Sequence, residues 1–133
     1  MKLNGTPNFI SSSAWFDGAD FKLITLCEGC TISRETRFLT HDWSMYNVSR
    51  AVGDSSFPAK SSLRPILVGE YCFIGASALL MPGTSIGKGS IVGAGSVVRG
   101  TIPDYSIVMG NPGTVVGDSR EYYNKNKDRF LAD

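Results

Sequence analysis

The side chain best suited to proton transfer in this chain is His41, the only histidine among its 133 residues. A neutral imidazole can remove a proton from a hydroxyl group near neutral pH. Asp42 follows it directly and could orient the imidazole, bind a substrate or bond to backbone at a corner of the chain. Asp17 and Asp20 could contact a substrate hydroxyl or pair with His41. The alternatives are an Asp-Gly turn at Asp17 and a histidine that only ends a repeat before a loop.

Three cysteines offer a second possible chemistry. Cys27 and Cys30 have the C-x-x-C spacing of zinc and redox sites, and Cys72 and His41 could complete a four-ligand set. However, Cys30 and Cys72 occupy positions of a six-residue repeat where packing requires a small side chain. We therefore expect core cysteines and no metal. An odd number of cysteines also makes no disulfide framework, which fits a reducing compartment.

A six-residue repeat organises the segment from Val68 to Val98. Its members share two features, an aliphatic first residue and a small fifth residue. The aliphatic residues are Val68, Ile74, Leu80, Ile86, Val92 and Val98, and the small ones are Cys72, Ala78, Thr84, Ser90 and Ser96. A period of six fits neither an α-helix nor an alternating strand, but it is typical of a parallel β-helix. We therefore predict an all-β fold, in which the aliphatic and small residues point inward.

The same repeat occurs upstream, with Leu26, Ile32 and Phe38 at the inward position, and it breaks at Trp43. Residues 43 to 65 then lack any period, so they should leave the solenoid as a long excursion loop. Loops of this length are usually functional or disordered. Its aromatic and basic residues favour an ordered loop that lines a site or contacts a neighbouring subunit; they are Trp43, Tyr46, Phe57, Arg50, Lys60 and Arg64.

The chain length fits a single domain, residues 1–133, with ends of different character. Residues 1–13 could form an irregular first coil or a cap. At the other end, a capping pattern at Asp118 to Glu121 predicts the start of a short helix, at about 119–130, that covers the last coil. The net charge of +1 gives no basic face for nucleic acid. No apolar run approaches the ~20 residues of a membrane span, and the N-terminus lacks a signal-peptide core, so a cytoplasmic location is expected.

The segment from Ile74 to Val116, together with THDWS at residues 40–44, resembles the hexapeptide-repeat acyltransferases. The likeness is greatest to the maltose, galactoside and capsular-polysaccharide O-acetyltransferases. It implies a left-handed parallel β-helix, assembled as a homotrimer with active sites between subunits. It also implies acetyl-CoA as donor and, as acceptor, a hydroxyl of a sugar or of a polysaccharide or lipopolysaccharide precursor.

The resemblance assigns roles to individual residues. By resemblance, His41 would be the general base. The residue types themselves add Asp42 as a further catalytic candidate and Asp17, Trp43 and Tyr46 as candidates for contact with the acceptor. Small corner residues would expose backbone to the pantetheine arm, and a cation would meet the phosphates; these donor residues are Ala76, Gly93, Ala94, Ser96 and Arg99. The pattern departs from the sugar enzymes at Gly100 and Thr114, where a basic residue is often found. Lys88, Arg64 or Lys60 would then serve the phosphates.

Other functions on the same solenoid remain open. The acceptor could be an amino sugar or serine, although serine enzymes usually carry a long helical N-terminal domain. A catalytically silent scaffold is a further alternative. A γ-type carbonic anhydrase needs three histidines per metal, which one histidine per chain does not easily provide.

Overall fold

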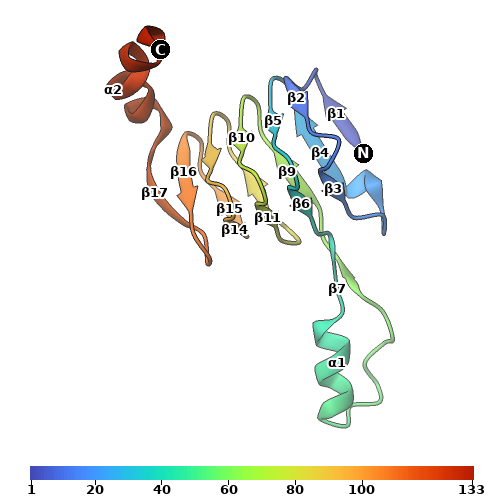
Figure 1. Cartoon of the computed structure of the whole chain (residues 1–133). Coiled ribbons are helices and arrows are strands. Elements are labelled where there is room, and N and C mark those ends of the chain that lie inside the picture. The colour runs from blue at the N-terminus through green and yellow to red at the C-terminus, as the bar shows by residue number, and fades with distance from the viewer.

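The computed structural model describes residues 1–133 and shows three parallel sheets that wind around one core (Figure 1). Sheet A contains β1 (Lys2–Asn4), β4 (Ile24–Cys27), β9 (Ile66–Val68), β12 (Ser85–Ile86) and β15 (Thr101–Ile102). Sheet B contains β2 (Phe9–Ile10), β5 (Thr31–Ile32), β10 (Phe73–Ile74), β13 (Ile91–Val92), β16 (Ser106–Met109) and the antiparallel β17 (Thr114–Asp118). Sheet C contains β3 (Trp15–Phe16), β6 (Arg37–Phe38), β11 (Leu79–Leu80) and β14 (Val97–Val98).

Successive strands of the solenoid belong to sheets A, B and C in turn, which is the arrangement of a parallel β-helix with three faces. The predicted fold is therefore confirmed. The coils meet at three corners, which we name by the sheets they join. Residues 69–72 lie at the A/B corner, 75–78 at the B/C corner and 81–84 at the C/A corner, and the other coils repeat this order.

The core consists of the residues that the six-residue repeat predicts. All six aliphatic residues from Val68 to Val98 are at most 1% exposed, and so are the five small residues at the fifth position. The upstream repeat packs in the same way, with Phe38 stacked on Phe16 at a centroid distance of 4.7 Å. Cys30 and Cys72 are buried among these side chains, which confirms their predicted place in the core.

Residues 1–13 form a coil of the solenoid, since β1 pairs in parallel with β4 and β2 with β5. The chain leaves the solenoid after Thr40 and returns at Arg64. We call the intervening residues 41–63 the arm. At its base β7 (His41–Asp42) pairs antiparallel with β8 (Ser62–Leu63), and α1 (Ser44–Ala51) fills its outer part (Figure 1).

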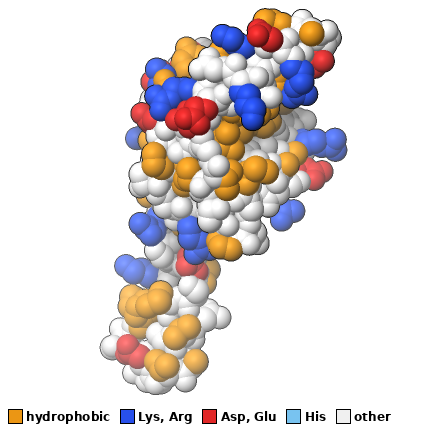
Figure 2. Space-filling view, turned by 90° about the vertical axis from the view of Figure 1, so that its left-hand side faces the viewer, with side chains coloured by type: hydrophobic (Ala, Val, Ile, Leu, Met, Phe, Trp, Pro, Cys, Tyr) orange, Lys and Arg blue, Asp and Glu red, His pale blue; other side chains and the backbone are white.

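The arm is ordered by its own hydrogen bonds. The Arg50 guanidinium donates to the carbonyl oxygens of Asp54 and Phe57, both at 2.6 Å. Its apolar side chains are nevertheless exposed, with Met45 at 62% and Val52 at 73%. Figure 2 shows hydrophobic groups gathered on the arm, below the solenoid.

The C-terminal helix α2 (Ser119–Ala132) begins where the sequence predicts. Asp118 accepts hydrogen bonds from the backbone N–H groups of Arg120 and Glu121 at 2.8 and 3.3 Å. The prediction that this helix covers the last coil is wrong in one respect. The strand β17, rather than the helix, pairs with β16 and covers the edge of sheet B, while α2 projects from the A/B corner (Figure 1). Neither helix has the length and apolar character needed to span a bilayer.

Candidate active site

His41 lies at the C/A corner, at the point where the arm leaves the solenoid. Its neighbour Thr40 is fully buried, and the Thr40 carbonyl accepts a hydrogen bond from the Arg64 backbone N–H at 2.9 Å, which closes the base of the arm. The His41 side chain is 34% exposed. The imidazole is therefore anchored on the solenoid side and open to solvent on the other.

Asp17 holds the imidazole from inside the chain. It follows β3, which pairs with β6, so its backbone N–H donates to the Phe38 carbonyl at 3.0 Å. Its Oδ2 atom accepts from His41 Nδ1 and from the Thr40 N–H, the latter at 3.0 Å, and its Oδ1 atom accepts from the Ala19 N–H at 3.0 Å. Asp17 is only 3% exposed. The prediction that it contacts an acceptor is thus replaced by the pairing with His41 that the sequence left open.

The pKa of Asp17 follows from these contacts. Burial raises it, but the hydrogen bonds from Ala19, Thr40 and His41 outweigh burial and lower the pKa to about 2. The carboxylate is ionised at neutral pH, so it accepts the Nδ1 proton of His41 and leaves Nε2 with a lone pair. Nε2 makes no hydrogen bond within the chain. The pair therefore presents a proton acceptor to the solvent side.

Asp42 does not contact the imidazole, which corrects its predicted orienting role. Its two carboxylate oxygens accept hydrogen bonds from the Ser44 N–H at 2.8 Å and the Ser44 hydroxyl at 2.9 Å. These bonds lower the pKa of Asp42 and fix the start of α1. The predicted acceptor residues Trp43 and Tyr46 lie beside it, in edge contact at 5.5 Å between ring centroids. The residues that follow His41 in the sequence thus form the start of the arm and do not hold the imidazole.

The predicted donor residues lie at two different corners. Ala76, Gly93 and Ala94 share the B/C corner, where the Gly95 N–H donates to the Ala76 carbonyl at 2.8 Å. The coils approach closely here, because a Cβ atom on Gly75 would lie 2.6 Å from the Ala94 nitrogen. Arg99 instead lies at the C/A corner, exposed to solvent.

Ser96 cannot contact a bound ligand, which corrects its prediction as a donor residue. It is 1% exposed, and its hydroxyl oxygen accepts a hydrogen bond from the Gly110 N–H at 3.1 Å inside the coil. The fifth position of the repeat is an interior position, and the hydroxyl satisfies backbone there.

Arg64 is a cation whose location the sequence did not define. Its guanidinium covers Gly83 at the C/A corner, where an added Cβ atom would lie 2.9 Å from Arg64 Cζ. Gly83 follows β11, and Arg99 follows the neighbouring strand β14. Arg64 and Arg99 therefore both lie on the corner that carries His41.

The dependence of the free energy of unfolding on pH, in the acid range, tests the lowered pKa of Asp17. A carboxyl group whose pKa is lowered on folding stabilises the protein above its unfolded value and loses this contribution as pH falls towards its folded value of about 2. The shift corresponds to about 2 kcal/mol. We expect Asp17→Asn to lower the free energy of unfolding by about this amount at pH 7, and the difference from wild type to shrink between about pH 4 and pH 2. Urea unfolding from pH 7 to pH 2 measures this difference, and a difference that stays constant over this range would contradict the assignment.

Residues 65–100 match the family model described as bacterial transferase hexapeptide (six repeats). The chain is 30% identical over 106 residues to a putative lipopolysaccharide biosynthesis O-acetyl transferase of Escherichia coli, covering 73% of this chain and 54% of that protein. It is 37% identical over 82 residues to a probable acetyltransferase of Mycobacterium tuberculosis, covering 59% of this chain and 27% of that protein. The chain thus spans about half of the first relative and about a quarter of the second.

Solved structures show the same likeness. A hexapeptide-repeat acetyltransferase of Vibrio cholerae, complexed with acetyl coenzyme A, aligns with a TM-score of 0.69 and 27% identity over 87% of this chain and 58% of that chain. A galactoside acetyltransferase in complex with coenzyme A aligns in fold with a TM-score of 0.65 and 19% identity over 92% of this chain and 66% of that chain. The predicted resemblance to the hexapeptide-repeat acyltransferases is confirmed: residues 65–100 match their hexapeptide repeats, and the chain shares the left-handed β-helix fold of these structures.

Proposed function

We propose that this protein is an O-acetyltransferase that moves the acetyl group of acetyl-CoA to a hydroxyl of a sugar, or of a polysaccharide or lipopolysaccharide precursor. The observation that carries the proposal is the buried Asp17 carboxylate bound to Nδ1 of a partly exposed His41. Carboxylate, imidazole and open Nε2 form the arrangement that activates a weak oxygen nucleophile. The relatives named for acetyl transfer supply the reaction class.

The proposed reaction proceeds through a tetrahedral intermediate. His41 Nε2 takes the proton of the acceptor hydroxyl while its oxygen attacks the thioester carbonyl carbon of the donor. The Asp17 carboxylate stabilises the imidazolium that forms. The tetrahedral oxyanion then collapses, the carbon–sulfur bond breaks, and the CoA thiolate receives the proton from His41. The products are an acetyl ester and free CoA, and no metal takes part.

A homotrimer would complete the site. Within one chain, His41 and the exposed backbone at Ala76 and Ala94 lie at opposite ends of sheet C. A cleft between two chains brings the C/A corner of one subunit against the B/C corner of the next, so that His41 faces the pantetheine groove of its neighbour. Arg64 and Arg99 share the corner of His41 and could meet the donor phosphates from there. The exposed apolar side chains of the arm fit a contact with the neighbouring subunit.

A bulky side chain at the B/C corner tests the donor groove. We expect Ala94→Trp to abolish detectable acetyl-CoA binding, because the indole would fill the groove, while the trimer persists. Titration calorimetry and light scattering measure the two properties, and Ala132→Trp at the exposed end of α2 is the matched control. Undiminished affinity in Ala94→Trp would place the donor elsewhere.

The acceptor is tested with a thiol-release assay, in which free CoA is measured for each candidate acceptor in turn. We expect CoA release with glycosides that carry free hydroxyls and not with serine or with an amino sugar blocked at its hydroxyls. Release with serine or an amine alone would change the acceptor class. No release with any acceptor, from a protein that binds acetyl-CoA, would favour the silent scaffold. Acetyl-CoA and the three free, buried cysteines both fit the predicted cytoplasmic location.

A further inference from the structure

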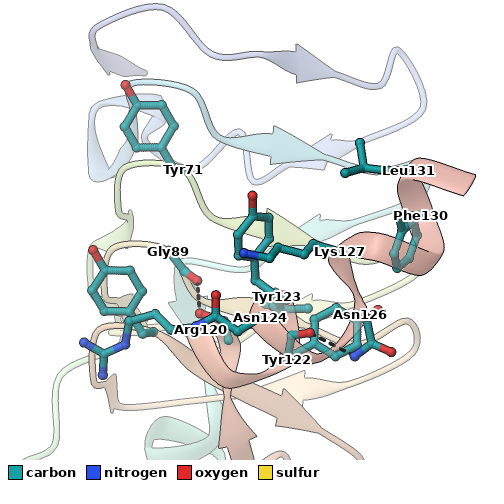
Figure 3. Close-up of a pocket in the computed structure, with 13 residues that line it drawn as sticks. Tyr71, Gly89, Arg120, Tyr122, Tyr123, Asn124, Asn126, Lys127, Phe130 and Leu131 are labelled. Carbon is teal, nitrogen blue, oxygen red and sulfur yellow. Dashed lines mark hydrogen bonds between the residues drawn. The ribbon is translucent and has the colours of Figure 1, made fainter.

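A hollow of about 780 Å³ lies between α2 and the A/B corner, the corner that carries neither His41 nor the proposed donor groove (Figure 3). Tyr71 and Gly89 line it from the solenoid, and Tyr123, Asn124, Asn126 and Lys127 line it from α2. The helix is fixed in place at its first residue. The Ser119 hydroxyl donates to the Gly89 carbonyl at 2.6 Å, and the Ser119 N–H donates to the Tyr105 carbonyl at 2.8 Å.

Two tyrosine rings on the solenoid side lie against glycines of the preceding coils. A Cβ atom on Gly29 would lie 2.3 Å from the Tyr71 ring, and one on Gly89 would lie 2.7 Å from the Tyr105 ring. The glycines therefore allow both rings to rest on the backbone. Tyr71 follows β9 and Tyr105 follows β15, with only β12 between these strands, so the rings are about 10 Å apart along the solenoid. The Arg120 guanidinium also lies over the Tyr105 ring, 4.3 Å from its centroid, so Tyr71, which is 59% exposed, offers the open ring on the solenoid side.

The helix side adds polar groups and positive charge. Tyr123 is 63% exposed, and Figure 3 shows its ring between Tyr71 and the body of α2. The lining includes the cations Arg120 and Lys127 and no carboxylate. Arg120 is paired with Asp118 at 2.8 Å, whereas Lys127 forms no ion pair, and its Nζ atom lies 5.7 Å from the centre of the Tyr123 ring. The hollow thus has one cation free to bind an anion.

We propose that this hollow binds an anionic glycan chain. The exposed rings of Tyr71 and Tyr123 would pack against the C–H faces of pyranose rings, while the tyrosine hydroxyls and the Asn124 amide bond to sugar hydroxyls. Lys127 would pair with a sugar carboxylate. A purely apolar ligand would cover the Lys127 ammonium without giving its charge a partner, which disfavours such a ligand.

The A/B corner is remote from His41, so the hollow would hold a polymeric acceptor rather than catalyse a second reaction. This inference rests on the proposed function for its biological sense. Glycan binding is measured without donor and without turnover, however, so the two can fail separately.

Electrophoresis through native gels that contain a dissolved glycan tests the proposal. The glycans are polysialic acid, alginate, which is a uronic acid polymer, and neutral dextran. We expect the wild-type protein to be retarded by the two anionic glycans and not by dextran. Tyr123→Ala and Lys127→Ala should each weaken the interaction about tenfold, as expected for loss of one ring contact or one charge pair at a binding surface. Both residues are exposed on α2, so both variants should fold; Phe9→Ala, an exposed aromatic on β2, should bind as the wild type does.

Three binding results would overturn the proposal: no retardation by either anionic glycan, equal retardation by dextran, or undiminished binding in both α2 variants. A fall in the oligomeric mass of the Tyr123→Ala variant would also overturn it, because the hollow would then be a contact with a second copy of the chain. Binding of anionic lipid vesicles through Tyr123 without glycan binding would assign it to a membrane surface instead. Acetyl transfer to a short acceptor is followed in parallel. Normal transfer without glycan retardation rejects only the glycan site, and glycan retardation without transfer rejects only the proposed function.

Discussion

His41→Ala is expected to lower the turnover number by roughly 10²- to 10⁴-fold, the usual contribution of a general base. The variant removes the group that takes the proton of the acceptor hydroxyl. His41 is partly exposed and lies outside the core, so the solenoid should fold as before. The thiol-release assay measures turnover, circular dichroism reports the fold, and acetyl-CoA titration should give an unchanged dissociation constant.

Turnover and acetyl-CoA affinity are measured separately, so a loss of chemistry can be told from a loss of donor binding. Lost turnover with intact donor binding assigns His41 to the chemical step. Unchanged turnover would remove it from the mechanism. Since the chain has no other histidine, the base would then be a carboxylate or a residue of a neighbouring subunit.

Asp17→Asn is the second change with a large expected effect. The carboxylate accepts three hydrogen bonds, from Ala19, Thr40 and His41, and an amide can accept only on its single oxygen. If the amide nitrogen faces His41, it meets Nδ1 as a donor and selects the tautomer whose proton is on Nε2. We expect turnover to fall roughly 10²- to 10⁴-fold, as in other carboxylate–imidazole pairs, with little change in the KM for acetyl-CoA.

Asp20→Asn provides the matched control. Asp20 lies three residues further along and accepts a hydrogen bond from the Lys22 N–H at 2.9 Å, which begins the short 3-10 helix Phe21–Leu23. It makes no bond with His41, and an asparagine can keep this cap. Near-normal turnover in Asp17→Asn would show that Asp17 supports the corner alone. An equal loss in both variants would indicate a structural effect of this turn.

The fold was largely predictable because the six-residue period encodes the coil directly. Each six-residue unit forms one side of a coil and places one aliphatic and one small residue inward, and every one of these positions from Val68 to Val98 is buried as expected. The helix α2 was predictable for a local reason, since Asp118 caps its first turn. The arm was predicted as an ordered loop at residues 43–65, without its helix. Its helix α1 lies in a polar segment with three exposed apolar residues, Met45, Val48 and Val52, which is a weak signal before their spacing is known to be helical.

The site was harder to predict because it depends on contacts between coils. Asp42 is adjacent to His41 in sequence but turns towards Ser44, whereas Asp17, which is 24 residues away, reaches the imidazole. The pairing of Phe16 with Phe38 determines this, since it places Asp17 beside Thr40 in the next coil. That register could have been read by aligning AWFD with TRFL. The misassignment of Ser96 has a different cause: the repeat already marks this residue as interior, and the resemblance was followed instead.

Calorimetric titration of the purified protein with acetyl-CoA, without an acceptor, measures whether the chain binds the proposed donor. We expect saturable binding at one site per chain, with a dissociation constant in the micromolar range common for enzyme substrates. The absence of heat and of any saturable binding would contradict it. Gly100 and Thr114, in place of the usual cations, would then leave the donor phosphates without sufficient partners. The solenoid would function without acetyl transfer.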